Sequence, residues 1–213
     1  MPINYLSIQS PIISEIDIKK SRFITYLYPI ETEEDFQNHL ANIRKEHYKA
    51  THHCQAFILN DDSSIQRMSD DGEPSGTAGV PMLEVLKNND LTYVMAVTVR
   101  YFGGTKLGAG GLIRAYSSAV SEALKEATII KNITQTMVDL IIDYSQNDTF
   151  TYLMGETELP ITIMDTQYTD KVTYQLAIDQ DQVDDVYNRL VERFNGQLEW
   201  NKLGEQTVDI PVK

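Results

Sequence analysis

One stretch constrains the fold of this chain more than any other: in residues 93–127 an apolar strand leads into a glycine-rich loop and then a helix. The stretch reads YVMAVTVRYFGGTKLGAGGLIRAYSSAVSEALKEA. Residues 93–102 are apolar on both faces and rich in β-branched side chains, which is typical of a strand in the middle of a sheet. From about Leu112 to Ala127, small and apolar residues recur at helical spacing, which predicts a helix with one buried face.

The glycine loop, residues 103–111, has the composition of an anion site. Eight of the eleven glycines of the chain lie between Gly72 and Gly111. A loop that ends in a helix N-terminus presents free backbone N–H groups and the positive end of the helix dipole, which suit a phosphate or a carboxylate. A turn that serves only tight packing is the alternative, because the loop matches neither the P-loop nor GxGxxG. The candidate glycines are Gly103, Gly104, Gly108, Gly110 and Gly111.

Cations surround this loop in the sequence. Residues 12–30 predict a hairpin with three cations at its tip, which taken alone would be ordinary solvated surface. Two more cations lie in the loop and at the start of the helix, and a sixth near the end of the preceding strand. We predict a basic strip around the glycine loop, formed by Lys19, Lys20, Arg22, Arg100, Lys106 and Arg114.

The predicted basic strip belongs to a chain that is acidic overall. The chain has a net charge of −13. Residues 1–130 hold 12 Lys and Arg against 16 Asp and Glu, whereas residues 131–213 hold 6 against 15. A site for a polyanion must therefore be a local patch in the first part of the chain.

The predicted strand at residues 51–60 carries His52, His53 and Cys54, a combination that can bind zinc or supply a thiol nucleophile. Adjacent strand residues point to opposite faces, so His53 cannot easily join the other two. The chain has no second cysteine to complete a structural zinc site. We interpret Cys54 as a small buried hydrophobe and expect no metal.

An acidic segment precedes a helix that we predict from about Gly79 to Asn88. Its carboxylates suit a divalent ion beside a phosphate, or they form a turn, which is the favoured interpretation. The residues kept as possible supporting members of the site are His52, His53, Asp70, Asp71 and Glu73.

Composition excludes several classes of protein. The chain is 42% hydrophobic and 23% charged, as in an ordinary soluble globular protein. The first twenty residues do not resemble a signal peptide, and no apolar run approaches the length of a membrane span. The single cysteine agrees with a reducing compartment. We expect a cytoplasmic protein without a cofactor or a membrane partner.

After Ile130 the pattern restarts. Strands and helices are expected in the order strand, helix, strand, strand, helix, strand, which is the ferredoxin-like arrangement. The sequence therefore predicts an α+β protein of two domains, residues 1–130 and residues 131–213, with a boundary near residues 129–132.

Two long motifs resemble the signature of the YigZ/IMPACT family. They are DDGEPSGTAGVPMLEVL, residues 70–86, and VRYFGGTKLGAGGLIRAYSSAVSEAL, residues 99–124; KKSRFI and HHCQAF match weaker elements. The resemblance covers the whole chain. It implies an N-terminal domain with the ribosomal-protein β-α-β fold of elongation factor G domain IV. It also implies a C-terminal ferredoxin-like domain similar to the last domain of that factor.

The resemblance also implies a role in translation. Eukaryotic relatives regulate translation initiation in the pathway that senses amino-acid starvation, and bacterial relatives are thought to bind nucleic acid or the ribosome. The leading hypothesis is a non-enzymatic protein that binds RNA or the ribosome through the basic strip, with a protein partner in translation control as a further candidate.

The alternative hypothesis is an enzyme. The implied N-terminal fold is shared with galactokinase-type kinases, so the glycine loop could hold the phosphate of a nucleotide or small molecule, with Asp70 or Asp71 on magnesium. The loop lacks the paired serines of that kinase motif, and the sequence shows no clear general base.

Overall fold

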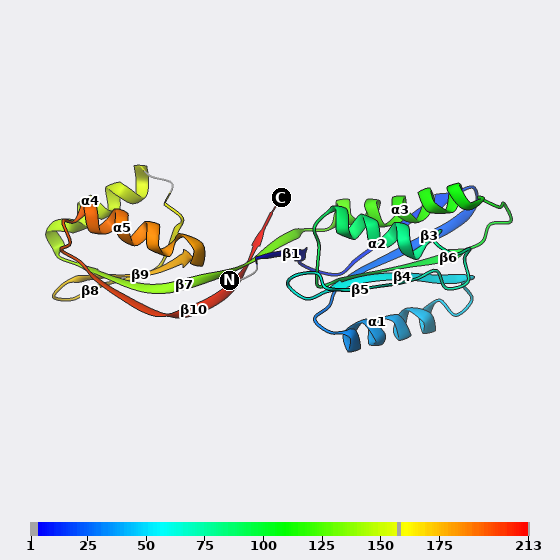
Figure 1. Ribbon diagram of the computed structural model, residues 1–213, viewed down its shortest axis with the longest axis horizontal. Helices are drawn as coiled ribbons and strands as arrows, with labels where there is room; N and C mark the ends of the chain where they lie inside the picture. Colours follow the sequence, from blue (N-terminus) through cyan, green and yellow to red (C-terminus); the bar gives the residue numbers. More distant parts are fainter. Residues whose placement is uncertain (1–3, 157–158, 213) are drawn as a thin grey trace. The chain divides into compact units, whose positions relative to one another are not determined.

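The computed structural model describes residues 4–156 and 159–212, which divide into two compact units (Figure 1). Among the described residues, the first unit comprises those up to Asn132 and those from Asp209 onward; the second runs from Ile133 to Val208. Both units combine helices with an antiparallel sheet, so the predicted α+β class with two parts is confirmed.

The sheet of the first unit has β6 at its centre. Its strand order is β2 (Ile12–Ile18), β3 (Ser21–Pro29), β6 (Val94–Tyr101), β4 (His52–Leu59) and β5 (Ile65–Ser69). All residues of β6 except Tyr101 are buried, as the apolar sequence predicts. Arg22 pairs with Tyr101 and Phe23 with Arg100, so the β2–β3 hairpin tip lies beside the end of β6.

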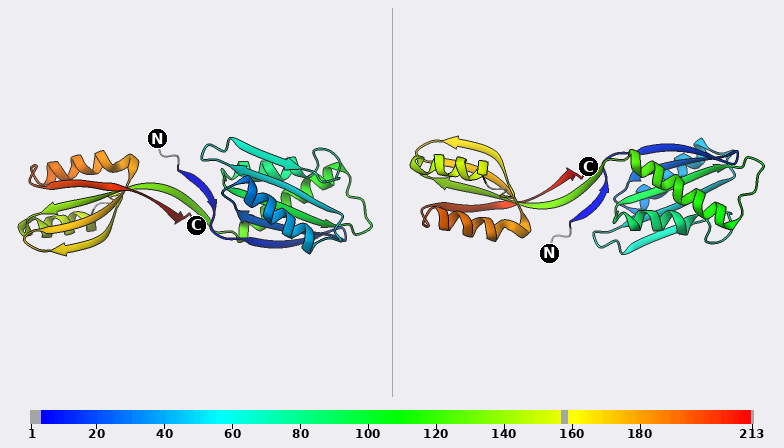
Figure 2. Two further views of the ribbon diagram at one scale, coloured as in Figure 1. Left: turned by 90° about the horizontal axis from the view of Figure 1, so that it is seen from below. Right: turned by 90° about the horizontal axis from the view of Figure 1, so that it is seen from above.

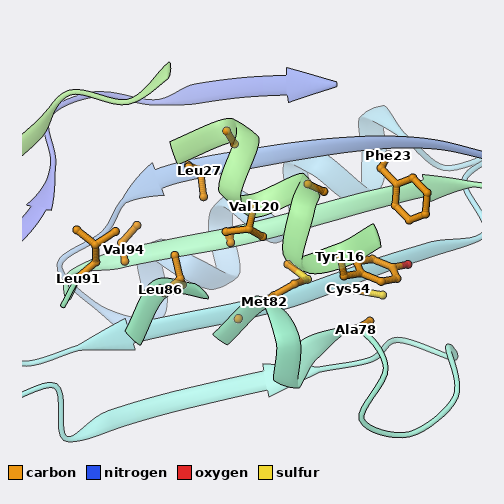
Figure 3. Packing of buried hydrophobic residues seen from close by; sticks show 14 of the residues in the cluster. Phe23, Leu27, Cys54, Ala78, Met82, Leu86, Leu91, Val94, Tyr116 and Val120 are labelled. Carbon is orange, nitrogen blue, oxygen red and sulfur yellow. The ribbon is translucent and has the colours of Figure 1, made fainter. Parts of the chain in front are cut away.

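Helices cover both faces of this sheet. The helix α1 (Glu33–Glu46) lies on one face, and α2 (Gly79–Asn88) and α3 (Ala109–Glu126) lie on the other (Figures 1 and 2). Thr32 and Asp35 form the capping box of α1. Between the sheet and the pair α2 and α3, Phe23 and Leu27 pack with Tyr116 and Val120 (Figure 3).

The helix α3 begins three residues earlier than predicted. Gly108 has φ 71° and ψ 166°, a conformation open essentially only to glycine, and the chain turns into the helix there. Gly110 and Gly111 therefore belong to the first helical turn. The predicted buried face is confirmed, and its members are Leu112, Ala115, Tyr116, Ala119, Val120 and Ala123.

The second unit has the predicted order of elements. They are the second part of β7 (Ile129–Ile142), α4 (Tyr144–Glu156), β8 (Ile161–Tyr168), β9 (Val172–Asp179), the short 3-10 helix Gln180–Gln182, α5 (Val183–Arg193) and most of β10 (Glu199–Pro211). The strand order is β10-β7-β9-β8. Both helices lie on one face of the sheet (Figure 1), where their apolar side chains pack with Val138, Leu140 and Leu176.

The sequence pattern predicts a strand at Thr134–Asp143, and β7 begins five residues earlier, at Ile129. The sequence pattern missed β1 (Tyr5–Ile8), which pairs with Ile129–Asn132. The expected boundary near residues 129–132 therefore falls inside a strand, and the division between the units follows Asn132. Within residues 4–156 and 159–212, no helix combines the length and apolar character that crossing a bilayer requires.

Candidate anion-binding surface at the glycine loop

The start of the glycine loop packs directly against the β2–β3 hairpin tip. A Cβ at Gly103 would lie 1.8 Å from the carbonyl oxygen of Lys20. The Gly103 N–H also donates to the Ser21 hydroxyl, with 3.3 Å between the heavy atoms. Lys19 and Lys20 have φ angles of 48° and 67°, which the tight two-residue turn of the hairpin requires. The structure thus brings the hairpin tip and the loop together.

The end of the glycine loop is an open helix N-terminus. The first N–H groups of a helix have no partner within the helix, and no side chain of the described residues caps α3. The start of α2 differs, because the Asp70 carboxylate accepts hydrogen bonds from the N–H groups of Ala78 and Gly79 at 2.9 and 2.8 Å. A carboxylate of the protein therefore neutralises the α2 terminus, whereas the α3 terminus has no side-chain cap among the described residues.

Five of the six cations of the predicted strip are exposed, and four of these are Lys19, Lys20, Lys106 and Arg114. Within the described part of the chain, none of the four forms an ion pair with a carboxylate. The Arg114 guanidinium folds back along the first turn of α3, where its Nη1 would lie 3.6 Å from a Cβ at Gly110. We call these four side chains, with the N–H groups of residues 109–111, the basic surface.

Two predicted cations do not add free charge to this surface. Arg22 is exposed, but its Nε and Nη2 donate to both carboxylate oxygens of Glu15 at 2.7 and 2.8 Å. Arg100 is only 4% exposed and pairs with buried Glu73 at 2.6 Å. The expectation that Arg100 belongs to the exposed strip is therefore wrong, because the turn that carries Glu73 folds back over the end of β6.

The Arg100–Glu73 pair is the centre of a buried network beneath the loop. The Tyr116 hydroxyl donates to the same Glu73 oxygen at 2.8 Å, and burial is the main reason that the pKa of Tyr116 is raised. Arg100 Nη2 donates to Ser21 Oγ at 3.3 Å, the oxygen that also accepts the Gly103 N–H. The network therefore ties the 70–79 turn, β6 and α3 to the base of the glycine loop.

Sequence reasoning did not assign roles to Ser21 and Tyr116. Tyr116 stands on a helix face that is otherwise rich in alanine and expected to be buried. Because a buried phenol needs a hydrogen-bond partner, this position could have indicated a buried polar contact. Nothing in the sequence pattern distinguished Ser21 from any other turn serine.

The histidines divide between the two faces of β4, as the strand geometry predicts. His52 donates from Nδ1 to the carbonyl oxygen of Asp71 at 2.8 Å, and its Nε2 lies 3.7 Å from Glu73. His53 lies on the opposite face, 3.1 Å from the carbonyl oxygen of His47. Of these two histidines only His52 therefore borders the buried network, and the His53 ring contacts His47 at the end of α1 instead.

Cys54 is fully buried, as predicted. Its burial, first among several causes, raises the pKa of the thiol to about 12. The thiolate that a nucleophile or a metal ligand requires is therefore disfavoured. Among residues 4–156 and 159–212, no three histidine, cysteine or acidic side chains are grouped so as to hold a metal ion.

The three candidate carboxylates are engaged within the protein. Asp70 uses both oxygens, because Oδ2 accepts the Gly76 N–H at 2.8 Å and Oδ1 accepts the two at the start of α2. Asp71 accepts the His53 N–H at 2.7 Å and pairs with Arg44 at 3.0 Å. Glu73 is buried with Arg100 and Tyr116, so each of the three carboxylates accepts hydrogen bonds from within the protein.

Comparison with known proteins finds a matching family model for each part of the chain. Residues 19–124 match the family model of the Impact N-terminal domain, and residues 140–197 match a domain of unknown function, DUF1949. A solved structure described as that of a hypothetical protein is 34% identical and superimposes with a TM-score of 0.60, covering 94% of this chain and 97% of the other.

Relatives from two bacteria align along most of their length. The IMPACT family member YvyE of Bacillus subtilis is 37% identical over 96% of this chain and 93% of its own. The IMPACT family member YigZ of Escherichia coli is 35% identical over 89% of this chain and 93% of its own. With the glycine loop and the 70–79 turn both inside the matched region, the chain belongs to the IMPACT family.

Proposed function

We propose that this protein is a translation-associated regulator that binds RNA, free or within the ribosome, through the basic surface. Membership of the IMPACT family supports the translational role, because the resemblance to that family implies a function in translation control. The basic surface supports the ligand, because phosphates suit both lysine and arginine side chains and the open N–H groups of a helix terminus.

One observation carries the proposal. The N-terminus of α3 is uncapped and adjoins Lys106 and Arg114, which have no carboxylate partner among the described residues. The protein has a net charge of −13, so the surrounding charge offers a polyanion little attraction. A local group of unpaired cations is then the feature that an RNA backbone can use.

The fold of each unit supports a ribosomal setting. The second unit has the sheet order β10-β7-β9-β8 with both helices on one face, which suits the ferredoxin-like fold that the family resemblance implies. For the first unit we propose the ribosomal-protein fold of elongation factor G domain IV. Both folds would then be shared with a factor that acts on the ribosome.

The enzymatic alternative has less support. Magnesium beside a nucleotide phosphate needs carboxylate oxygens that are free to coordinate it. Asp70 and Asp71 direct their oxygens to backbone N–H groups and to Arg44. Coordination of magnesium by Asp70 or Asp71 would require the 70–79 turn to open, with loss of the α2 cap.

Fluorescence anisotropy with a labelled single-stranded RNA, repeated at several salt concentrations, tests this function. Each cation that contacts a phosphate releases counterions, so Lys106→Ala should reduce the slope of log affinity against log salt by about 0.7. Arg114→Ala should do the same. The matched control is Lys125→Ala, since Lys125 is an exposed lysine of the same helix, roughly 16 Å along the axis from Arg114, and should leave the slope unchanged.

Two results would overturn the proposal. The first is the absence of detectable RNA binding by the wild-type protein at low salt. The second is binding whose affinity and salt slope are unaffected by Lys106→Ala and Arg114→Ala.

A further inference from the structure

We infer that the basic surface takes single-stranded RNA and that an unpaired base stacks on Phe102. This inference rests on the proposed function and narrows its ligand from RNA in general to a strand whose base faces are free. It follows from the position of Phe102, from how its ring is held and from the cations around it.

Phe102 links β6 to the glycine loop and is 47% exposed. A single exposed apolar side chain is ordinary on a protein surface. This one, however, is the residue immediately before Gly103, at the junction of the hairpin tip and the loop. A strand whose phosphates contact Lys20 and the start of the glycine loop would therefore pass near its ring.

Contacts with Arg100 and Thr51 hold Phe102 in place. The Arg100 guanidinium carbon lies over the ring, 5.5 Å from its centroid. Arg100 is itself fixed by the ion pair with Glu73 at 2.6 Å. The backbone N–H of Phe102 donates to the Thr51 hydroxyl at 3.4 Å. A ring that is ordered before binding loses little entropy when a ligand stacks on it.

The combination of ring and cations distinguishes among ligands. Lys106, Arg114 and the N–H groups of α3 supply positive charge for phosphates. A ligand that consists of phosphate alone would gain nothing from contact with an apolar ring. A nucleobase presents a flat π face that stacks on an aromatic side chain regardless of its sequence. Base faces are hidden within a duplex and open in a single strand. A single strand is therefore the ligand that uses both features at once.

The experiment measures anisotropy with a short labelled single strand and with the same strand annealed to its complement, at one low salt concentration. Alanine substitution at a stacked aromatic ring weakens binding by about 5- to 150-fold. We expect a loss in this range for Phe102→Ala with the single strand, and a small change with the duplex. Phe102→Tyr should retain affinity, whereas Phe102→Leu, which keeps apolar area without a π face, should lose it.

Controls separate stacking from general damage. Tyr168→Ala removes a ring of the second unit that is 62% exposed. It should change neither the affinity for the single strand nor the affinity for the duplex. The salt slope of Phe102→Ala should equal that of the wild type, because no phosphate contact is lost. Equal melting temperatures for the wild type and Phe102→Ala would show that the fold is intact.

The outcomes distinguish this inference from the proposed function. RNA binding that depends on Lys106 but not on Phe102, or equal affinity for the single strand and the duplex, overturns the inference and leaves the function standing. Absence of RNA binding overturns both. A concentration-dependent dimer that Phe102→Ala abolishes would assign the ring to contact with a second copy of the chain, and would also overturn the inference.

Discussion

Gly103 and Gly110 lie in the same loop but meet different surroundings. A Cβ at Gly103 would lie 1.8 Å from the Lys20 carbonyl oxygen, a backbone atom that cannot move without shifting the hairpin tip. A Cβ at Gly110 would meet only the end of the Arg114 side chain at 3.6 Å, which is ordinary van der Waals contact. The first glycine therefore has a packing role, whereas the second leaves room for a ligand.

We predict that Gly103→Ala destabilises the protein. The added methyl group forces the loop and the hairpin apart, and overpacking of this kind lowers the free energy of unfolding by about 1–3 kcal/mol. Thermal or urea unfolding of the two proteins measures the loss. A variant as stable as the wild type would show that the loop and the hairpin tip do not touch.

We predict the opposite pattern for Gly110→Ala. Alanine favours helix over glycine by up to about 1 kcal/mol, so stability should be retained or improved. RNA affinity should fall, because the methyl group stands between a phosphate and the N–H groups of the first turn. Gly108→Ala is a poorer test, because φ at Gly108 is 71° and a side chain there strains the backbone. Unchanged RNA affinity in Gly110→Ala would exclude close approach of a phosphate to this turn.

At the scale of elements, the 70–79 turn and α2 depend on Asp70. Burial of the Asp70 carboxylate would raise its pKa, but the N–H groups of Gly76, Gly79 and Ala78 outweigh this effect and lower it. A carboxylate with a lowered pKa stabilises the fold above its unfolded value of about 3.9, and this stability is lost as the pH falls through the folded pKa.

We therefore predict that Asp70→Asn lowers the melting temperature most at neutral pH. Loss of a helix cap costs about 0.5–2 kcal/mol. Below about pH 4 the carboxyl of the unfolded chain becomes protonated, so the difference between the two proteins should shrink as the pH falls further towards the lowered folded pKa. Melting temperatures of both proteins between neutral pH and pH 3 test this. A constant difference over the whole range would show that the charge of Asp70 does not contribute.

Elements whose sequence signal lies in neighbouring residues could be predicted from the sequence. The β-branched run of β6 and the alanine-rich face of α3 are both carried by neighbouring residues. The missed strand β1 is only four residues long and pairs with a segment more than a hundred residues away. Short strands of this kind are defined by their partner rather than by their own pattern.

The same distinction explains the candidate site. The sequence indicated the exposed cations Lys106 and Arg114, because exposure of charge is the ordinary expectation. It misplaced Arg100, because the burial of that cation depends on Glu73, which is 27 residues away in the chain. It also passed over Phe102, whose exposure follows from the path of the loop rather than from residue type.

At the scale of the whole molecule, the described residues form three hydrophobic clusters, two in the first unit and one in the second, and the clusters share no buried residues. We predict that a fragment of residues 1–132 folds by itself. It retains β1 and the segment Ile129–Asn132 with which β1 pairs, although it lacks the residues from Asp209 onward that belong to the same unit. A dispersed amide NMR spectrum is the expected result. A collapsed spectrum would show that the two units need each other to fold.

Amide chemical-shift mapping of the full chain during titration with single-stranded RNA tests the central claim most directly. The claim locates the ligand at the uncapped N-terminus of α3 and the adjoining loop. We predict that the largest shifts belong to the amides of residues 103–111, with smaller ones at Lys19 and Lys20 and none in the second unit. Saturation with RNA that leaves the amides of residues 109–111 unmoved, or that moves mainly residues 133–208, would contradict the account.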